Sequence, residues 1–253
     1  MTTEPKLILL IGSGGSGKST LLMQLPKLAL INCDRNLAGP IDYLSHMKFN
    51  PDVTVYNVWQ SKEGTPNEIH ACYDRLVEIL TEIRDLLKKE PGKYSCVAVD
   101  GLSMVGDFIK QKIFFKQKRE AMESRDWDTY KSGIVTVVVV RFREIQALGA
   151  NCFLTCHEKF VTKKDPKDMM AEILIGILPN VQGESERQLA GMFTDAWAME
   201  SRPAGAGKVE FLIKTVKDGL RDLKKSSYKM PSEIIIKDGE LVWPKIKEYI
   251  QTN

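Results

Sequence analysis

A glycine-rich segment stands near the start of the chain, directly after a run of aliphatic residues. Residues 7–11 read Leu-Ile-Leu-Leu-Ile, residues 12–20 read Gly-Ser-Gly-Gly-Ser-Gly-Lys-Ser-Thr, and residues 21–25 are mostly apolar. A short aliphatic run that ends at glycine predicts a buried strand, and the apolar residues beyond the loop predict a short helix. The sequence therefore predicts a strand, a glycine loop and a helix in immediate succession.

The loop matches the Walker A pattern, G-x-x-x-x-G-K-[ST], in full. Glycines let the backbone curl until successive N–H groups point inward at phosphate oxygens. We expect Lys18 to neutralise the β- and γ-phosphates of a nucleoside triphosphate, and Ser19 to offer its hydroxyl to Mg²⁺. The residues predicted to hold the nucleotide here are Gly12, Ser13, Gly14, Gly15, Ser16, Gly17, Lys18, Ser19 and Thr20.

Apolar strands alternate with helical segments along the rest of the chain. Apolar runs predict strands at 28–33, 53–59, 95–100 and 151–157, and apolar residues at three- and four-residue steps predict an amphipathic helix over 65–89. This alternation predicts an α/β fold with a mainly parallel sheet flanked by helices. Ligands of such sheets bind beyond the carboxyl ends of the strands.

One segment gives conflicting signals. Residues 134–140 are rich in β-branched side chains, so propensity alone favours a strand there. A parallel neighbour for the strand that ends at Asp100 nevertheless requires a crossover connection. We therefore predict a helix over about 133–148.

The C-terminal part of the chain predicts a small β-structure and a closing helix. Strands are expected at 209–216 and 233–243, with the second folded into a hairpin at Lys237-Asp-Gly-Glu240, because Asp-Gly between apolar runs favours a hairpin turn. A short helix is expected over 244–251. We predict a single domain over 1–253, with a core over about 5–225 and the hairpin and helix over about 226–253.

Three polar side chains are predicted at the sheet edge where the loop lies. Asp100 ends an apolar strand as a Walker B carboxylate does, which would make it a Mg²⁺ ligand with Ser19; a strand-end cap is the alternative. Asp34 is interpreted either as a general base for an attacking water or as a helix cap. His157 is interpreted either as a sensor of the γ-phosphate or as an ordinary hydrogen-bonded residue. With Lys18, these three are the predicted catalytic residues.

Charge and composition limit the classes of protein. Thirty-six Lys and Arg against 33 Asp and Glu leave a net charge of +3, so any nucleic-acid-binding surface must be local. No apolar run approaches the roughly 20 residues needed to span a bilayer, and the N-terminus lacks the pattern of a secretory signal, so we expect a cytoplasmic protein without a membrane partner. The five cysteines are spread through apolar stretches and are expected to be buried thiols.

Five segments follow one another in a characteristic order. They are 12–20, Leu30-Ile-Asn-Cys-Asp34, Val97-Ala-Val-Asp100-Gly-Leu-Ser103, Phe153-Leu-Thr-Cys-His157-Glu-Lys159 and Lys217-Asp-Gly-Leu-Arg221. In this order the sequence resembles the RecA-fold phage ATPases, in particular the short RecA-core single-strand annealing proteins found beside phage recombination genes. The resemblance spans residues 7 to about 225.

The resemblance implies a RecA-like P-loop NTPase core that binds ATP at subunit boundaries of a ring or filament. It implies that Asp34 activates water, that His157 senses the γ-phosphate, and that Lys217 and Arg221 reach the nucleotide of a neighbouring subunit. Single-stranded DNA and a single-strand DNA-binding protein are the partners that the resemblance implies. Asp34 is shorter than the glutamate of the recombinases proper, and His157 replaces an amide, so annealing or mediator activity is favoured over strand exchange.

Two basic clusters fall after the strands that the family uses for DNA. Cations neutralise phosphates and aromatic rings stack on unpaired bases, so these clusters predict DNA contacts of little sequence specificity. The alternative for the first cluster is a solvated helix face whose phenylalanines pack inward or onto a neighbouring subunit. The predicted DNA-binding residues are Lys110, Lys112, Lys116, Lys118 and Arg119 in the first cluster and Lys159, Phe160, Lys163 and Lys164 in the second.

Three other functions remain as alternatives. A GTPase would use Thr162-Lys-Lys-Asp165 as a guanine-reading motif, but that motif lies several residues beyond its strand. A small-molecule kinase would carry an arginine-rich lid, and residues 166–177 contain no arginine. A nucleotide-gated assembly protein would bind ATP and oligomerise without turnover.

Overall fold

The computed structural model describes residues 4–59, 66–166, 172–182, 188–205, 208–227 and 229–250. The strands are β1 (Leu7–Ile11), β2 (Leu28–Asn32), β3 (Val53–Asn57), β4 (Cys96–Asp100), β5 (Asn151–Cys156), β6 (Glu158–Lys164), β7 (Glu172–Pro179), β8 (Asp195–Pro203), β9 (Val209–Lys214) and β10 (Glu233–Ile236). The helices are α1 (Lys18–Leu22), α2 (Ala38–His46), α3 (Pro66–Lys89), α4 (Leu102–Gln117), α5 (Asp126–Val135), the π-helical η1 (Thr136–Arg141), α6 (Phe142–Gln146), the 3₁₀ turn η2 (Leu189–Met192) and α8 (Trp243–Ile250).

Eight strands form the main sheet, in the order β10-β9-β8-β1-β5-β4-β2-β3. The pairings from β8 across to β3 are all parallel, whereas β9 and β10 join antiparallel at one edge. The predicted α/β fold with a mainly parallel sheet is therefore confirmed. Because the sheet is parallel here, β1, β2, β4 and β5 all point their carboxyl ends to the same edge.

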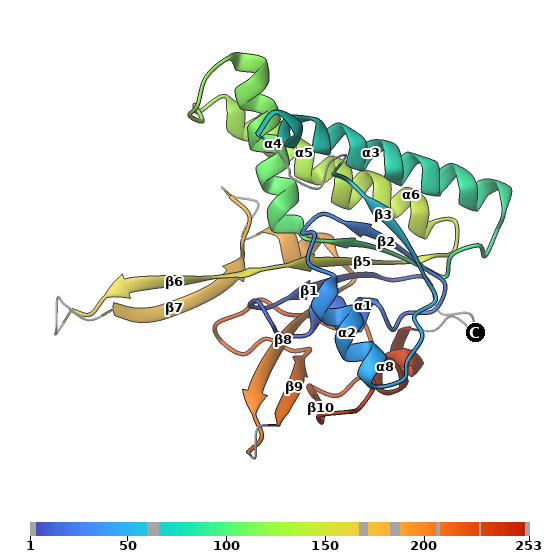
Figure 1. The fold of residues 1–253 in the computed structure, drawn as a ribbon. Helices are drawn as coiled ribbons and strands as arrows, with labels where there is room; N and C mark the ends of the chain where they lie inside the picture. The colour runs from blue at the N-terminus through green and yellow to red at the C-terminus, as the bar shows by residue number, and fades with distance from the viewer. Residues whose placement is uncertain are drawn as a thin grey trace.

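Helices cover both faces of the sheet (Figure 1). Successive side chains of β1 alternate between them: Leu7 and Leu9 pack in the cluster that contains α3 to α6, while Ile8 and Leu10 pack in the cluster that contains α1, α2 and α8. Every residue of β1, β2, β4 and β5 is buried. Strands buried on both faces explain why the sequence shows continuous apolar runs instead of alternation.

The β-branched segment is helical, as the crossover argument predicts. Residues 126–146 run through α5, η1 and α6, and β4 and β5 pair in parallel on either side of the connection. The helical segment buries a stripe of large side chains spaced three or four residues apart, which outweighs the local preference for strand. These residues are Tyr130, Ile134, Val137, Val138, Phe142 and Ile145.

The predicted C-terminal hairpin at 237–240 is wrong. β10 ends at Ile236 and pairs antiparallel with β9, not with a strand beyond Gly239. The chain instead enters α8, and the side-chain oxygen of Gln24 accepts hydrogen bonds from the backbone N–H groups of Val242 and Trp243. This contact holds the start of α8 against the residues that follow α1, so the turn at Gly239 joins a strand to a helix.

Three strands, β6, β7 and β8, were not predicted from the sequence, whereas β9 lies within the strand predicted at 209–216. β8 pairs in parallel with β1 and antiparallel with β9, so it joins β9 and β10 to the main sheet. β6 and β7 form a separate two-stranded sheet that projects from the body of the molecule as an arm (Figure 1). All five cysteines are buried thiols, as predicted. Within the described ranges, none of the helices has the length and apolar character required to cross a bilayer.

Candidate nucleotide site

The glycine loop lies between β1 and α1 and is packed closely by neighbouring backbone. The N–H of Gly12 donates to the carbonyl oxygen of Cys156, 3.2 Å away, and a Cβ at residue 12 would lie 2.3 Å from the carbonyl oxygen of Met199. Gly17 has a left-handed φ of +88°, and a Cβ there would press on the Phe211 ring at 3.0 Å. Both glycines are therefore required for this curled path, since a side chain has no room at either position.

Lys18 is buried and folded back over the loop. Its ammonium group donates to the carbonyl oxygens of Gly12 at 2.7 Å and Ser13 at 2.8 Å, and to the Ser16 hydroxyl at 3.3 Å. Burial lowers the pKa of Lys18, while the nearby Asp100 carboxylate acts in the opposite direction. Among the described residues no ion pair involves Lys18. Its ammonium group therefore donates only to uncharged oxygens, which the oxygens of a bound anion can replace.

Asp100 ends β4 and faces the loop. It is 2% exposed, and one carboxylate oxygen, Oδ1, accepts a hydrogen bond from the Thr155 hydroxyl at 2.5 Å. Burial raises the pKa of Asp100 above its ordinary value, and the Thr155 and Ser19 hydroxyls beside the carboxyl group oppose the rise. The predicted Mg²⁺ ligands Ser19 and Asp100 thus lie near each other, and Thr155, which was not predicted, adjoins them.

Asp34 lies just beyond β2, next to His157 at the end of β5. Its Oδ2 is 3.8 Å from Nε2 of His157, while its Oδ1 is buried with no hydrogen-bond partner. The N-cap residue of α2 is Leu37, so the alternative interpretation of Asp34 as a helix cap is wrong. The backbone N–H of His157 donates to the Ser103 hydroxyl at 3.2 Å. This hydrogen bond holds the backbone from which the imidazole projects.

These residues meet because four neighbouring parallel strands end at one edge. The loop follows β1, Asp34 follows β2, Asp100 ends β4, and His157 follows β5. The set contains a buried cation, backbone N–H groups around a glycine loop, a hydroxyl beside a carboxylate, and a carboxylate oxygen that lacks a partner. A triphosphate fits the first two features, and Mg²⁺ fits the hard oxygen ligands of Ser19 and Asp100.

Lys217 and Arg221 lie outside this set. Arg221 is buried, and its guanidinium ion-pairs with Asp218 at 2.9 Å, Glu200 at 2.9 Å and Glu158 at 3.1 Å. Lys217 is exposed and pairs with Asp222. A guanidinium enclosed by three carboxylates of its own chain is not presented to a neighbouring subunit, which corrects the expectation drawn for Arg221. The arginine instead ties the start of β6 to β8.

The first basic cluster lies on and just beyond α4, and three of its five cations are neutralised. Lys110 pairs with Asp107, Lys112 with Asp74, and Arg119 with Glu123 and Asp126. Lys116 and Lys118 remain exposed. They line an open depression of about 860 Å³ in which Phe115, 62% exposed, stacks on His70 at 3.8 Å. Three of the five predicted DNA contacts are therefore engaged by carboxylates of the same chain, and Phe115 does not pack inward as the solvated-face alternative expects.

The second basic cluster lies on β6 of the projecting arm (Figure 1). Lys159, Lys163 and Lys164 are exposed, and Phe160 is 57% exposed between them. The arm therefore presents cations and an aromatic ring together.

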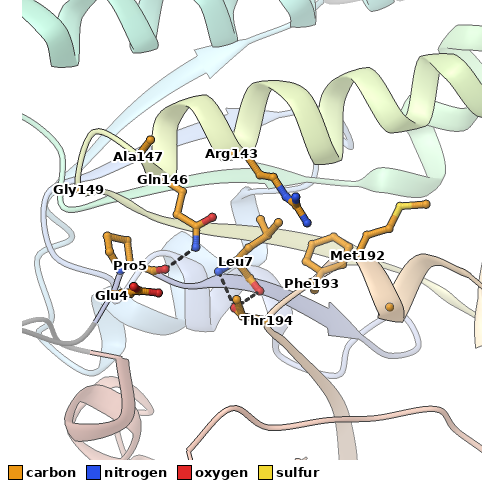
Figure 2. Close-up of a pocket in the computed structure, with 11 residues that line it drawn as sticks. Glu4, Pro5, Leu7, Arg143, Gln146, Ala147, Gly149, Met192, Phe193 and Thr194 are labelled. Atoms are coloured by element: carbon orange, nitrogen blue, oxygen red, sulfur yellow. Dashed lines mark hydrogen bonds between the residues drawn. The ribbon is translucent and has the colours of Figure 1, made fainter.

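Another cavity, of about 550 Å³, lies at the opposite end of β1 (Figure 2). Leu7 forms part of its wall, and the side chains of Arg143, Met192 and Phe193 surround it. None of the predicted site residues lines this cavity. It is separated from the glycine loop by the full length of β1.

A glycine loop after the central strand, with Lys18, Ser19 and a carboxylate on the next strand but one, defines the chain as a P-loop NTPase. The sequence also matches the AAA domain family AAA_24 over residues 4–218, a range that includes the loop, Asp34, Asp100 and His157. The chain belongs to this family, which indicates a nucleotide-binding ATPase. No curated protein matches the sequence.

Proposed function

We propose that this chain is a Mg²⁺-dependent ATPase whose turnover responds to single-stranded DNA. The observation that carries the ATPase part is the convergence of Lys18, Asp34 and Asp100 on one glycine loop. The DNA part rests on the cations and aromatic ring of the arm, which begins one residue after His157.

Each residue has a defined task in this proposal. The loop N–H groups and Lys18 bind the phosphates, and Lys18 exchanges its carbonyl partners for phosphate oxygens. Ser19 and Asp100 hold Mg²⁺, which offsets charge on the phosphates. Asp34 accepts a proton from the attacking water through the oxygen that has no partner in the protein. His157, 3.8 Å from Asp34, donates toward the γ-phosphate.

Adenine nucleotides are proposed over guanine nucleotides because of where the candidate guanine motif lies. Thr162 to Lys164 belong to β6 of the arm, and the Thr162 hydroxyl donates to Glu172 on the other arm strand. A guanine-reading motif must face the base of a nucleotide whose phosphates occupy the loop. The motif on the projecting arm does not meet this requirement.

The proposed DNA surface consists of Lys159, Phe160, Lys163 and Lys164 on the arm, with Lys116 and Lys118 beyond α4 as a second contact. Positive side chains release counterions from phosphates, and exposed rings stack on unpaired bases. The resemblance to phage RecA-core annealing proteins supports a role in recombination, annealing or replication, with self-association into a ring or filament. A single-strand DNA-binding protein is the proposed protein partner.

The decisive experiment measures ATP turnover with and without single-stranded DNA. We expect DNA to raise turnover and Lys18→Ala to reduce it by about 10²-fold or more, since it removes a fixed charge from the reacting phosphates. Lys93→Ala, a surface lysine paired with Glu90, is the matched control. Preferential hydrolysis of GTP with no effect of DNA contradicts the proposal, and ATP binding without turnover identifies an assembly protein instead.

The arm is tested separately by charge removal. Lys163→Ala with Lys164→Ala should weaken DNA binding and abolish stimulation, whereas Lys88→Ala with Lys89→Ala on α3 removes the same charge elsewhere. Equal DNA affinity in the two double variants would exclude the arm as a DNA-binding surface.

A further inference from the structure

Thr155 is a buried polar residue at the nucleotide end of β5 that no motif assigns. It is 1% exposed, and its hydroxyl makes two short contacts across to β4. The hydroxyl donates to Oδ1 of Asp100 at 2.5 Å and accepts from the backbone N–H of Gly101 at 2.8 Å. One side chain of β5 therefore holds both the carboxylate and the backbone that follows it.

The two contacts fix the direction of the hydroxyl proton. A threonine hydroxyl has one proton and two lone pairs. The N–H of Gly101 occupies a lone pair, so the proton is left to point at Asp100. Asp100 consequently cannot rotate without losing a hydrogen bond in a buried place, which costs about 1–3 kcal/mol.

The position of Asp100 matters because of Ser19. The Ser19 hydroxyl is close enough to the same carboxyl to lower its pKa, so the two oxygen ligands expected for Mg²⁺ are already neighbours in the protein. A carboxylate that turned away would separate them. Since Thr155 engages Oδ1, Oδ2 keeps its capacity for further partners.

We propose that Thr155 is the positioning residue of the metal site: it fixes Asp100 so that Asp100 and Ser19 together hold the Mg²⁺ of the nucleotide. This inference rests on the proposed function, because only a nucleotide–metal site gives the orientation of Asp100 a chemical consequence. Thr155 does not touch the metal or the nucleotide; it acts through Asp100.

Two substitutions separate the hydroxyl from the shape of the side chain. Thr155→Val keeps the branched shape that suits a strand and removes the hydroxyl. Thr155→Ser keeps the hydroxyl and removes a methyl group. If Thr155→Val does not fold, Thr155→Ala and Thr155→Ser make the same comparison, since they differ only by the hydroxyl.

The test uses the full chain and a fluorescent N-methylanthraniloyl derivative of ATP. Its binding is measured in EDTA and then at rising Mg²⁺, and Mn²⁺ binding to the protein–nucleotide complex is followed by electron paramagnetic resonance. We expect unchanged affinity in EDTA for all variants. Removing the hydroxyl should raise the Mg²⁺ midpoint and weaken Mn²⁺ binding by about 10- to 100-fold, as loss of a residue that orients a metal ligand does. Thr155→Ser should restore both.

The outcomes distinguish the inference from the function on which it rests. If the wild-type chain binds no adenine nucleotide, the proposed function fails. If the wild-type chain binds nucleotide with Mg²⁺ and the variant without the hydroxyl has the same Mg²⁺ midpoint, only the role of Thr155 fails. A folded variant that loses affinity equally in EDTA and in Mg²⁺ also overturns the inference, because the residue then supports the whole loop and not the metal.

Discussion

Gly101, between β4 and α4, gives the sharpest test of the catalytic arrangement. Its φ is +111°, and a Cβ placed there would lie 2.2 Å from Oδ1 of Asp34 and 2.8 Å from its carboxyl carbon. Gly101→Ala therefore adds one methyl group at the point where Asp34 rests. The substitution leaves Lys18, Ser19 and the glycine loop untouched.

Two effects of different size follow from this geometry. A left-handed backbone costs a residue with a Cβ about 1–2 kcal/mol. The Asp34 carboxylate must in addition move by about 1 Å to reach an ordinary contact, and a misplacement of that size costs about 10²-fold in rate. Because Asp34 is the proposed base, we expect turnover to fall by about 10²- to 10⁴-fold. Nucleotide affinity should change little.

The assay pairs urea unfolding with ATP turnover and uses Gly92→Ala as the matched control. Gly92 follows α3, has a φ of +81°, and has no atom within 4 Å of an added Cβ. Both variants should lose about 1–2 kcal/mol of unfolding free energy from backbone strain. Only Gly101→Ala should lose turnover. Equal turnover in the two variants refutes the assignment of Asp34.

The Arg221 cluster and the α4 depression give further predictions. Arg221→Met leaves the buried Glu158 without its cation, so urea unfolding should show a loss of about 3–5 kcal/mol; a loss below about 1 kcal/mol would remove the cluster as a structural tie. The pKa of Asp218 is lowered in the folded protein: burial alone would raise it, but hydrogen bonds from the backbone N–H groups of Arg221 and Leu220 outweigh burial. The contribution of Asp218 to stability is therefore fully present above its unfolded pKa of about 3.9 and is lost as the pH falls through the lower folded pKa. Melting temperatures from pH 7 to pH 2 should therefore fall less steeply for Asp218→Asn, and parallel curves would contradict this. Replacing Lys116 and Lys118 with alanine should reduce the salt slope of single-stranded DNA binding by about 2 if each meets one phosphate, and an unchanged slope would exclude the depression.

The nucleotide site is the part of the structure that the sequence predicts best. The Walker A loop requires glycine and lysine at fixed spacing, so its residues identify it without any tertiary information. Asp34, Asp100 and His157 follow from one further rule, that parallel strands end at one edge. The same topological rule identified the helix at 133–148 against its β-branched composition, because a parallel pair has to be connected by a crossover.

The remaining features depend on partners that a local pattern does not show. The local sequence places Lys112 in a basic cluster without a nearby acid, whereas in the fold Lys112 pairs with Asp74, 38 residues earlier. Arg221 pairs with Glu158, 63 residues away. Because this partner is distant in the sequence, the residues around Arg221 do not indicate that its side chain is buried. Asp238-Gly239 does form a turn, but the partner of β10 is β9 and not a strand beyond that turn. Thr155 had a weak signal only: it is a hydroxyl near the end of an otherwise apolar strand.

The arrangement around His157 gives the two halves of the proposed function a physical connection. The carbonyl oxygen of His157 accepts a hydrogen bond from the N–H of Asn180 at 2.7 Å, so the residue before β6 also holds the chain that leaves β7. Both strands of the arm are therefore anchored at the residue whose imidazole faces Asp34. Glu158, next in sequence, is in turn fixed by Arg221. A displacement of the His157 backbone has to move both roots of the arm or break these bonds. Under the proposed function, we expect this connection to be the route by which nucleotide in the loop and DNA on the arm affect each other.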